Sequence, residues 1–174
     1  MNPHDSVNLK NQIESFYSWY LNMIKEERVN PEFNPLFVRR ADGMTTLDFT
    51  KYKAQLIKYK FTEDFIQRKI SGYNQCLENL HKMPFDKFSQ LNDLDEFENI
   101  NCDFSNRYEW IGGMEPKDKA ELTSLKLINK KTIAGYVNFI SNLKPDGSAM
   151  VLFKKFGREW KIDNLELEYK NKGR

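Results

Sequence analysis

Two carboxylates in the middle of the chain could carry acid–base chemistry. Asp103 and Glu109 lie close together in the sequence, and Tyr108 or Tyr136 could place a hydroxyl beside them. A carboxylate inside an apolar cavity can act as a general base, because burial tunes its pKa. An exposed position is the more usual one for Asp and Glu, and we favour that interpretation for both residues.

Aromatic residues could line a ligand pocket around these carboxylates. Trp110, Tyr136, Phe139 and Trp160 fall in predicted strands, and Tyr20 lies on the apolar side of the first predicted helix. Packing in a hydrophobic core explains this aromatic set more simply than a pocket does. The complete set of candidate pocket residues is Tyr20, Asp103, Tyr108, Glu109, Trp110, Tyr136 and Trp160.

Nucleophilic catalysis needs a base beside the nucleophile, and the sequence offers few bases. Of its two histidines, His4 lies near the start and His81 near the end of a predicted helix, where its charge would favour the helix dipole. Cys76 and His81 stand at positions i and i+5, and this spacing does not bring two side chains together on a helix. Cys76 and Cys102 could form a disulfide or stay reduced, and both alternatives stay open. We expect no catalytic residues.

An acidic run from Asp93 to Asp103 suggests a calcium site. An EF-hand loop that begins at Asp93 needs glycine at its sixth position and glutamate at its twelfth, where this chain has Glu98 and Phe104. No CxxC motif or Cys/His cluster suggests zinc. We therefore expect an exposed acidic loop, no metal and no cofactor.

Charge is distributed unevenly along the chain, although the net charge is only +2. Residues 61–115 hold 5 Lys/Arg against 11 Asp/Glu, whereas residues 116–174 hold 13 against 7. The lysines alternate with apolar residues along predicted strands, which indicates the solvated face of a sheet. Because they do not form a basic patch with stacking aromatics, we expect no nucleic-acid partner.

The first half of the chain is predicted to be helical. Apolar residues at helical spacing predict a helix over 7–27, a second from Asp48, and a third from the N-cap Thr62 to Pro84. Residues 29–47 contain Pro31, Pro35 and Gly43 and are predicted to be a loop. Residues 85–106 are predicted to be irregular, with a short helix near 87–94.

The second half is predicted to form five strands. Their ranges are 107–114, 120–129, 132–141, 148–156 and 159–169, and turns are expected at 129–131, 145–147 and Gly157. A change of phase at Asp163-Asn164 predicts a bulge, as does Gly112-Gly113 in the first strand. Helices followed by an antiparallel meander indicate an α+β fold, with one domain over 1–174, helices over about 7–82 and the sheet over about 107–169.

Two segments carry a resemblance to a known superfamily. Gly157-Arg-Glu-Trp-Lys-Ile-Asp-Asn-Leu165 resembles the last strand of the NTF2-like (cystatin-like) superfamily, where Gly-x-Trp-x-Ile is common. Phe16-Tyr-Ser-Trp-Tyr-Leu21 resembles the start of DUF3828, a family of uncharacterised bacterial proteins in that superfamily, and Asn101-Cys-Asp-Phe104 is similar to a further stretch of it. The resemblance implies a long helix in the concavity of a curved sheet and an envelope or secreted setting, with no established activity.

These observations lead to two functional hypotheses, beside the simpler one of a purely structural domain whose partner surface lies in the 29–47 loop. The first is a non-catalytic bacterial protein that recognises a protein partner, either envelope-associated or a toxin-neutralising immunity protein. The alternative is a carrier of a small apolar ligand, or an NTF2-like enzyme, with a cavity between the first helix and the sheet. No stretch is long and apolar enough for a transmembrane segment, and Met1 leads into polar residues rather than a secretory leader. Localisation stays open: periplasmic or secreted if a leader has been removed, cytoplasmic otherwise.

Overall fold

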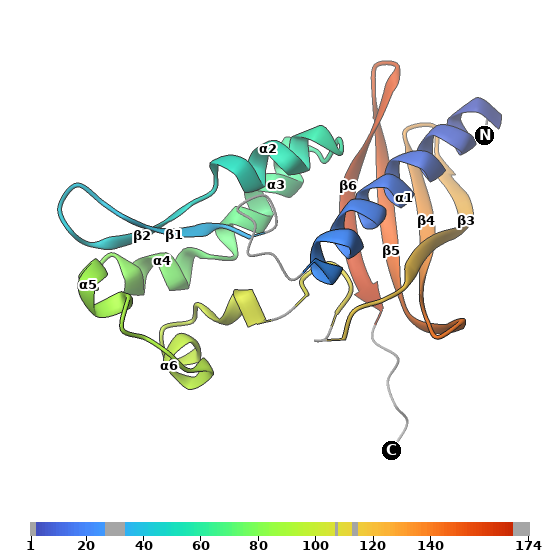
Figure 1. Cartoon of the computed structure of the whole chain (residues 1–174). Helices are drawn as coiled ribbons and strands as arrows, with labels where there is room; N and C mark the ends of the chain where they lie inside the picture. Colours follow the sequence, from blue (N-terminus) through green and yellow to red (C-terminus); the bar gives the residue numbers. More distant parts are fainter. Residues whose placement is uncertain (1–2, 27–33, 107, 113–114, 169–174) are drawn as a thin grey trace.

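The computed structural model describes residues 3–26, 34–106, 108–112 and 115–168 and has an α+β fold (Figure 1). The helices in these ranges are α1 (Pro3–Lys25), α2 (Thr50–Lys58), α3 (Glu63–Ser71), α4 (Asn74–Leu80), α5 (Phe85–Phe88) and α6 (Leu94–Asn99), followed by the 3-10 turn η1 (Asp103–Asn106). The strands are β1 (Leu36–Arg39), β2 (Thr45–Asp48), β3 (Lys119–Asn129), β4 (Thr132–Ser141), β5 (Lys144–Phe156) and β6 (Glu159–Glu168).

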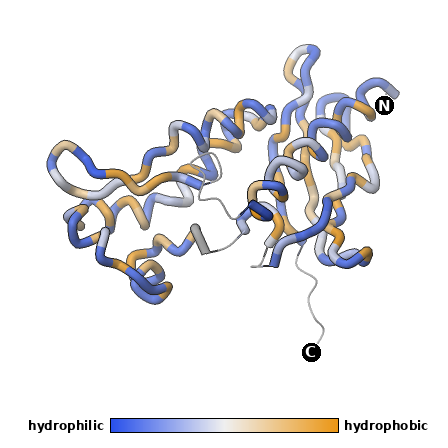
Figure 2. The backbone as a smooth tube through the Cα atoms, in the orientation of Figure 1, coloured by the Kyte–Doolittle hydropathy of each residue, from blue (hydrophilic) through white to orange (hydrophobic). Residues whose placement is uncertain are grey.

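The C-terminal part of the chain is a four-stranded antiparallel sheet in the order β3-β4-β5-β6. Each strand pairs with the next one along the chain, because the connecting turns are too short for any other arrangement. The predicted strands over 120–129, 132–141 and 148–156 are confirmed, and so is the last one over its described residues 159–168; the turns at 129–131 and Gly157 are confirmed as well. In Figure 2 hydrophobic residues recur along these strands, as expected for a sheet that buries one face.

The predicted turn at 145–147 is wrong, since β5 already begins at Lys144. The turn lies instead at Asn142 and Leu143, which both have positive φ (50° and 63°), as a two-residue hairpin turn of this kind requires. Asp146 and Gly147 form a bulge: Ile140 pairs with Pro145 and Asn138 with Ser148, so that two residues of β5 face one of β4. Gly147 adopts φ 101°, which glycine tolerates best.

The bulge predicted in the last strand is confirmed. Leu152 pairs with Asn164 and Phe153 with Ile162, which leaves Asp163 as the extra residue of β6. The Asp163 carboxylate turns toward the helices, where it accepts a hydrogen bond from the Thr62 hydroxyl at 3.0 Å. The bulge therefore joins the edge of the sheet to the start of α3.

Helix α1 crosses one face of the sheet, which we call the inner face (Figure 1). Its apolar residues repeat at helical spacing, and all seven of its buried residues lie on this stripe: Leu9, Ile13, Phe16, Tyr17, Tyr20, Leu21 and Ile24. Tyr17 packs edge-on against Phe139 of β4, with ring centroids 5.2 Å apart. Phe16, Tyr17 and Phe139, each at most 1% exposed, fill the middle of the interface between helix and sheet, which is part of the region where the ligand-carrier hypothesis expects a cavity.

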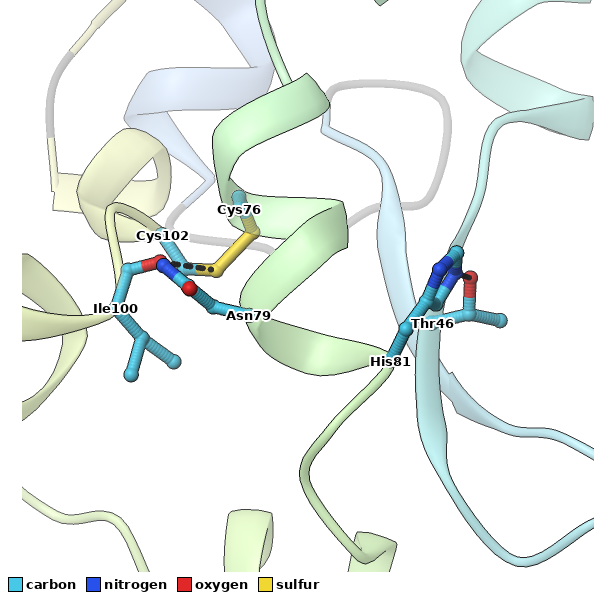
Figure 3. Close-up of a disulfide and its surroundings, with 6 residues drawn as sticks. All are labelled: Thr46, Cys76, Asn79, His81, Ile100 and Cys102. Carbon is cyan, nitrogen blue, oxygen red and sulfur yellow. Dashed lines mark hydrogen bonds between the residues drawn. A yellow bond between two sulfur atoms is a disulfide. The ribbon is translucent and has the colours of Figure 1, made fainter.

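A second group of buried residues, the disulfide cluster, lies apart from this main core. Its buried members are Leu47, Tyr73, Cys76, Leu80, Phe88 and Cys102. Cys76 of α4 and Cys102 form a disulfide, with a Cα–Cα distance of 5.0 Å. Of the two alternatives that the sequence left open, a disulfide or two reduced cysteines, the structure has the disulfide. Figure 3 shows that Asn79 supports this link, because its side-chain amide donates to the Ile100 carbonyl at 2.9 Å.

Several predictions for the helical half need correction. The predicted loop at 29–47 contains the β1–β2 hairpin, which pairs Leu36 with Asp48; residues 29–33 lie outside the described ranges. The single helix predicted over 62–84 is two helices, α3 and α4, interrupted at Gly72, a poor helix former. The short helix predicted near 87–94 is replaced by α5 and α6, the latter begun by a capping box at Asp93.

The strand predicted at 107–114 is also wrong over the residues that the structure describes there, 108–112. The Tyr108 carbonyl accepts hydrogen bonds from the amides of Ile111 and Gly112, which is a turn and not a ladder. Trp110 and Ile111 are both buried although they are neighbours, so the alternation of a half-buried strand is absent. Arg107, Gly113 and Met114 lie outside the described residues, and with them part of the predicted Gly112-Gly113 bulge.

No helix among the described residues is long and apolar enough to cross a membrane.

Candidate functional site

The tight turn after η1 places two neighbouring side chains on opposite sides of the backbone. Trp110 points inward and is 1% exposed in the main core, where its ring meets Phe16 at right angles with centroids 5.4 Å apart. Glu109 stays half-buried at the surface, with 23% of its side chain exposed. The turn thus holds a carboxylate above a wall of aromatic rings.

Both oxygens of Glu109 have partners. Oε1 accepts from the Lys69 ammonium at 2.8 Å, and Oε2 accepts from the Tyr52 hydroxyl at 3.0 Å. The same ammonium lies 4.5 Å from the centroid of the Trp110 ring, a cation–π arrangement. Glu109 is therefore an ion-paired, hydrogen-bonded carboxylate, anchored to α2 and α3.

Beside it lies a cavity of about 390 Å³, which we call the Glu109 pocket. Its polar lining consists of Arg68, Lys69, Asn101, Asp103, Tyr108 and Glu109, and the rest comes from Gly72, Tyr73, Phe104, Gly112 and Leu167. The lining offers hydrogen-bond donors and acceptors as well as aromatic surface. Its size falls in the range of small-molecule sites.

Four tyrosines are buried around this pocket and in the main core. We call them the buried tyrosine set: Tyr17, Tyr20, Tyr52 and Tyr73, of which Tyr73 lines the pocket itself. Burial raises the pKa of all four hydroxyls well above the ordinary value, and the negative charge of Glu109 raises it further for all but Tyr17. These phenols remain neutral across the physiological pH range. They can donate or accept hydrogen bonds but cannot serve as bases.

Of the seven candidate residues predicted from the sequence, three line the Glu109 pocket: Asp103, Tyr108 and Glu109. Tyr20 and Trp110 lie behind it, joined by a hydrogen bond of 3.4 Å from the Trp110 amide to the Tyr20 hydroxyl. These five residues come from α1 and from the segment that connects the helices to the sheet.

The other two candidate residues lie elsewhere. Gly135 and Val137 face α1, and because side chains alternate along a strand, Tyr136 projects from the opposite face of the sheet. Trp160 lines a larger groove of about 730 Å³ between α1 and the β5–β6 turn. The sequence could not show that Tyr136 and Trp160 lie away from the Glu109 pocket, because both are aromatic residues in apolar segments, as the other aromatic candidates are.

The residues that hold Glu109 were not among the candidates. Tyr52 and Lys69 come from helices α2 and α3, whereas the candidate residues came mainly from the predicted strands. Lys69 did carry a signal: it stands four residues after the buried Phe65, on the side of α3 that packs inward. A cation on an apolar helix face is a reason to look for a buried acidic partner.

Cys76 and His81, which the sequence places near each other, do not form a nucleophile–base pair. The Cys76 thiol is consumed in the disulfide, and His81 Nε2 lies 3.1 Å from the Thr46 hydroxyl (Figure 3). Over the described ranges of the chain, no three His, Cys, Asp or Glu side chains gather where they could hold a metal ion. No family model, curated protein or solved structure matches the chain.

Proposed function

We propose that this protein is a non-catalytic binding protein that recognises a protein partner. The observation that carries the proposal is the outer face of the four-stranded sheet, opposite α1. The helices with the most extensive contacts to the sheet are α1, on the inner face, and α3, beside the edge strand β6 (Figure 1). An antiparallel sheet with one face packed and one face open to solvent presents a broad surface to a partner.

The centre of this outer face is apolar. Tyr136 of β4 pairs with Met150 of β5, and Leu152 follows on the same side of β5. All three are only partly exposed, while Lys126, Lys154 and Glu166 stand toward the edges of the face. An apolar centre within a polar rim is the usual anatomy of a protein–protein interface.

The Glu109 pocket supports the non-catalytic part of the proposal. Lys69 and Tyr52 donate to the two oxygens of Glu109, one to each, so this carboxylate is engaged in joining α2 and α3 to the turn that carries it. Arg68 is likewise committed, since its guanidinium donates to the Asp163 carbonyl at 2.7 Å. These groups hold the helices against the edge of the sheet.

The charge distribution supports a steered encounter with a charged partner. Asp86, Asp95, Glu96 and Glu98 lie on α5 and α6, whereas most of the basic residues within 115–168 lie on the strands of the sheet. Opposed charges on one molecule orient an approaching partner before contact. An immunity protein that neutralises a toxin, or an envelope-associated interaction protein, fits this pattern, and a helix laid across a bulged antiparallel sheet is in keeping with the proposed NTF2-like resemblance.

A pull-down from source cells, read by mass spectrometry, tests the proposal. The outer-face variant Met150→Lys is compared with Leu94→Lys, which places the same charge on an exposed leucine of α6. We expect the wild type and the Leu94 variant to retain one stoichiometric protein and the Met150 variant to lose it, with unchanged circular dichroism. Failure of the wild type to retain any protein, or equal retention by both variants, would contradict the proposal.

The second candidate function is a small-ligand carrier, favoured by the size and mixed lining of the Glu109 pocket. The pocket lies at the junction of α3, the 101–112 segment and β6, and not between α1 and the sheet. Native mass spectrometry of the purified protein would reveal a bound ligand as added mass. Loss of that mass in Tyr108→Ala would assign the ligand to this pocket.

A further inference from the structure

One end of the sheet combines exposed apolar side chains with a high density of cations. We call it the hairpin end; it comprises the β3–β4 turn (residues 126–132), the β5–β6 turn (residues 154–161) and the first turns of α1. Figure 1 shows both turns at the same end of the molecule as the N-terminus. The two turns are in direct contact, because the Lys155 amide donates to the Lys131 carbonyl at 2.9 Å.

Four of the seven exposed large apolar side chains among the described residues lie at this end. Leu127 is 50% exposed, Ile128 is 54% exposed and Phe156 is 46% exposed, and Val7 of α1 adds a fourth at 58%. Exposed apolar residues that occur singly need no explanation, but a group at one end of a molecule indicates a surface that becomes covered.

The same end is strongly basic. Its cations are Lys126, Lys130, Lys131, Lys154, Lys155, Arg158 and Lys161. The acidic groups nearby are paired: Asp5 lies 3.9 Å from Lys155, Glu159 lies 2.9 Å from Lys60, and Asp163 lies 3.9 Å from Lys154. Within the described parts of the chain, Lys126, Lys130, Lys131 and Arg158 make no ion pair, so their charge is available to an external anion.

The chemistry of this surface fits a bilayer better than a protein. Protein interfaces are depleted in lysine at their centre, whereas six of the seven cations here are lysines. Anionic headgroups offer a diffuse negative charge that flexible lysines can follow, and the acyl region offers a solvent for exposed aliphatic and aromatic tips. Hairpin turns that present such tips can enter the interface without unpairing the sheet.

We propose that the hairpin end is a peripheral binding surface for anionic lipid bilayers. Ile128 and Phe156 enter the headgroup region, and the cations around them contact lipid phosphates. Orientation follows from the same geometry: the disulfide cluster, with its acidic helices α5 and α6, lies away from the hairpin end and is kept off a negatively charged surface (Figure 1). This inference goes beyond the proposed protein-binding function and uses a different surface.

Vesicle sedimentation of the full chain tests the inference. Vesicles of phosphatidylglycerol mixed with phosphatidylcholine are compared with vesicles of phosphatidylcholine alone, at low and at raised ionic strength. We expect binding to the mixed vesicles, weak binding to the neutral ones and loss of binding with salt. Because each lysine near an anionic surface contributes about 1 kcal/mol, Lys130→Ser with Lys131→Ser is expected to weaken binding about 30-fold.

Two further variants separate the apolar contribution from general charge. Ile128→Ser with Phe156→Ser keeps every cation and is expected to weaken binding by at least roughly tenfold. Lys82→Ser with Lys87→Ser removes the same charge from exposed positions at the other end of the molecule and is expected to bind as the wild type does. Circular dichroism of all variants verifies that they fold.

Three results would overturn the inference. They are no binding of the wild type to mixed vesicles, equal loss in the Lys82/Lys87 control, and duplex DNA competing as well as lipid. If vesicles do not bind but the hairpin-end variants lose the protein retained in the pull-down, this surface is a protein interface and the lipid assignment is wrong. The pull-down and the vesicle assay are independent, so failure of one proposal leaves the other measurable.

Discussion

Removal of the Cys76–Cys102 disulfide is expected to lower the free energy of unfolding by about 3–4 kcal/mol. The two cysteines are 26 positions apart, and a cross-link over such a loop restricts the unfolded chain far more than the folded one. In the folded state the segment is already ordered by α4, α5, α6 and the burial of both cysteines, which are 1% and 0% exposed. The loss should therefore come mainly from the unfolded chain.

Urea unfolding followed by circular dichroism, with and without a reductant, measures this loss. Cys76→Ala with Cys102→Ala is the control, because its stability should not respond to the reductant. In thermal unfolding the same change is expected to lower the Tm of the wild type by roughly 10 °C for a chain of this size. Hydrogen exchange should show the first loss of protection in α4 and α6, while β4 stays protected.

A difference below about 1 kcal/mol between oxidised and reduced protein would refute this reasoning, because it would mean that the cross-link barely restricts the unfolded chain. An equal response of the double-alanine control to the reductant would show that the effect does not come from this disulfide. Exchange that increases equally in β4 and α4 under native conditions would contradict the local character of the change.

Three other perturbations follow from the packing. Above pH 10 the protein should unfold cooperatively, because folding raises the pKa of the hydroxyls in the buried tyrosine set. The free energy of unfolding is at its full value below the unfolded pKa of about 10 and falls above it by about 1.4 kcal/mol per tyrosine per pH unit. Phenolate absorbance rising without loss of circular dichroism would contradict this. A double-mutant cycle of Glu109→Gln and Lys69→Met, measured by urea unfolding, should give a coupling energy of about 1 kcal/mol. A coupling energy of zero would mean that the ion pair does not stabilise the fold. Gly135→Ala should cost about 1–3 kcal/mol in urea, because a Cβ there would come within 2.9 Å of Leu122 and Val151; unchanged stability would show that the sheet can adjust.

The sheet could be predicted from the sequence because local signals and burial agree there. Strands β3 to β6 alternate apolar and polar residues, and Asp163 marks its bulge by breaking that alternation. The misplaced turn at 145–147 shows where this fails. Pro145, Asp146 and Gly147 are typical turn residues, yet Asn142 and Leu143 form the turn, and nothing about Leu143 predicts a positive φ.

The segment between the helices and the sheet was harder to predict, because tertiary packing overrides the local secondary-structure preference there. Trp110 and Ile111 have strong strand propensity, but burial of both neighbours against α1 and α3 imposes a turn. The break at Gly72 had a visible cause, yet the apolar stripe continued past it and favoured one helix. Lys69 could be matched with Glu109 only after the turn was known, since no sequence period relates the two residues.

The order of the elements has a consequence for how the protein is made. Helix α1 leaves the ribosome before the strands that bury its apolar stripe, and the whole disulfide cluster is made in between. The disulfide cluster can assemble early from neighbouring segments, while α1 must wait for Ile162 and Leu165 of β6 to complete the main core. During that interval its phenylalanine and tyrosine rings are open to any cellular factor that captures nascent amphipathic helices. Biogenesis of this chain, more than its final stability, should therefore depend on chaperones.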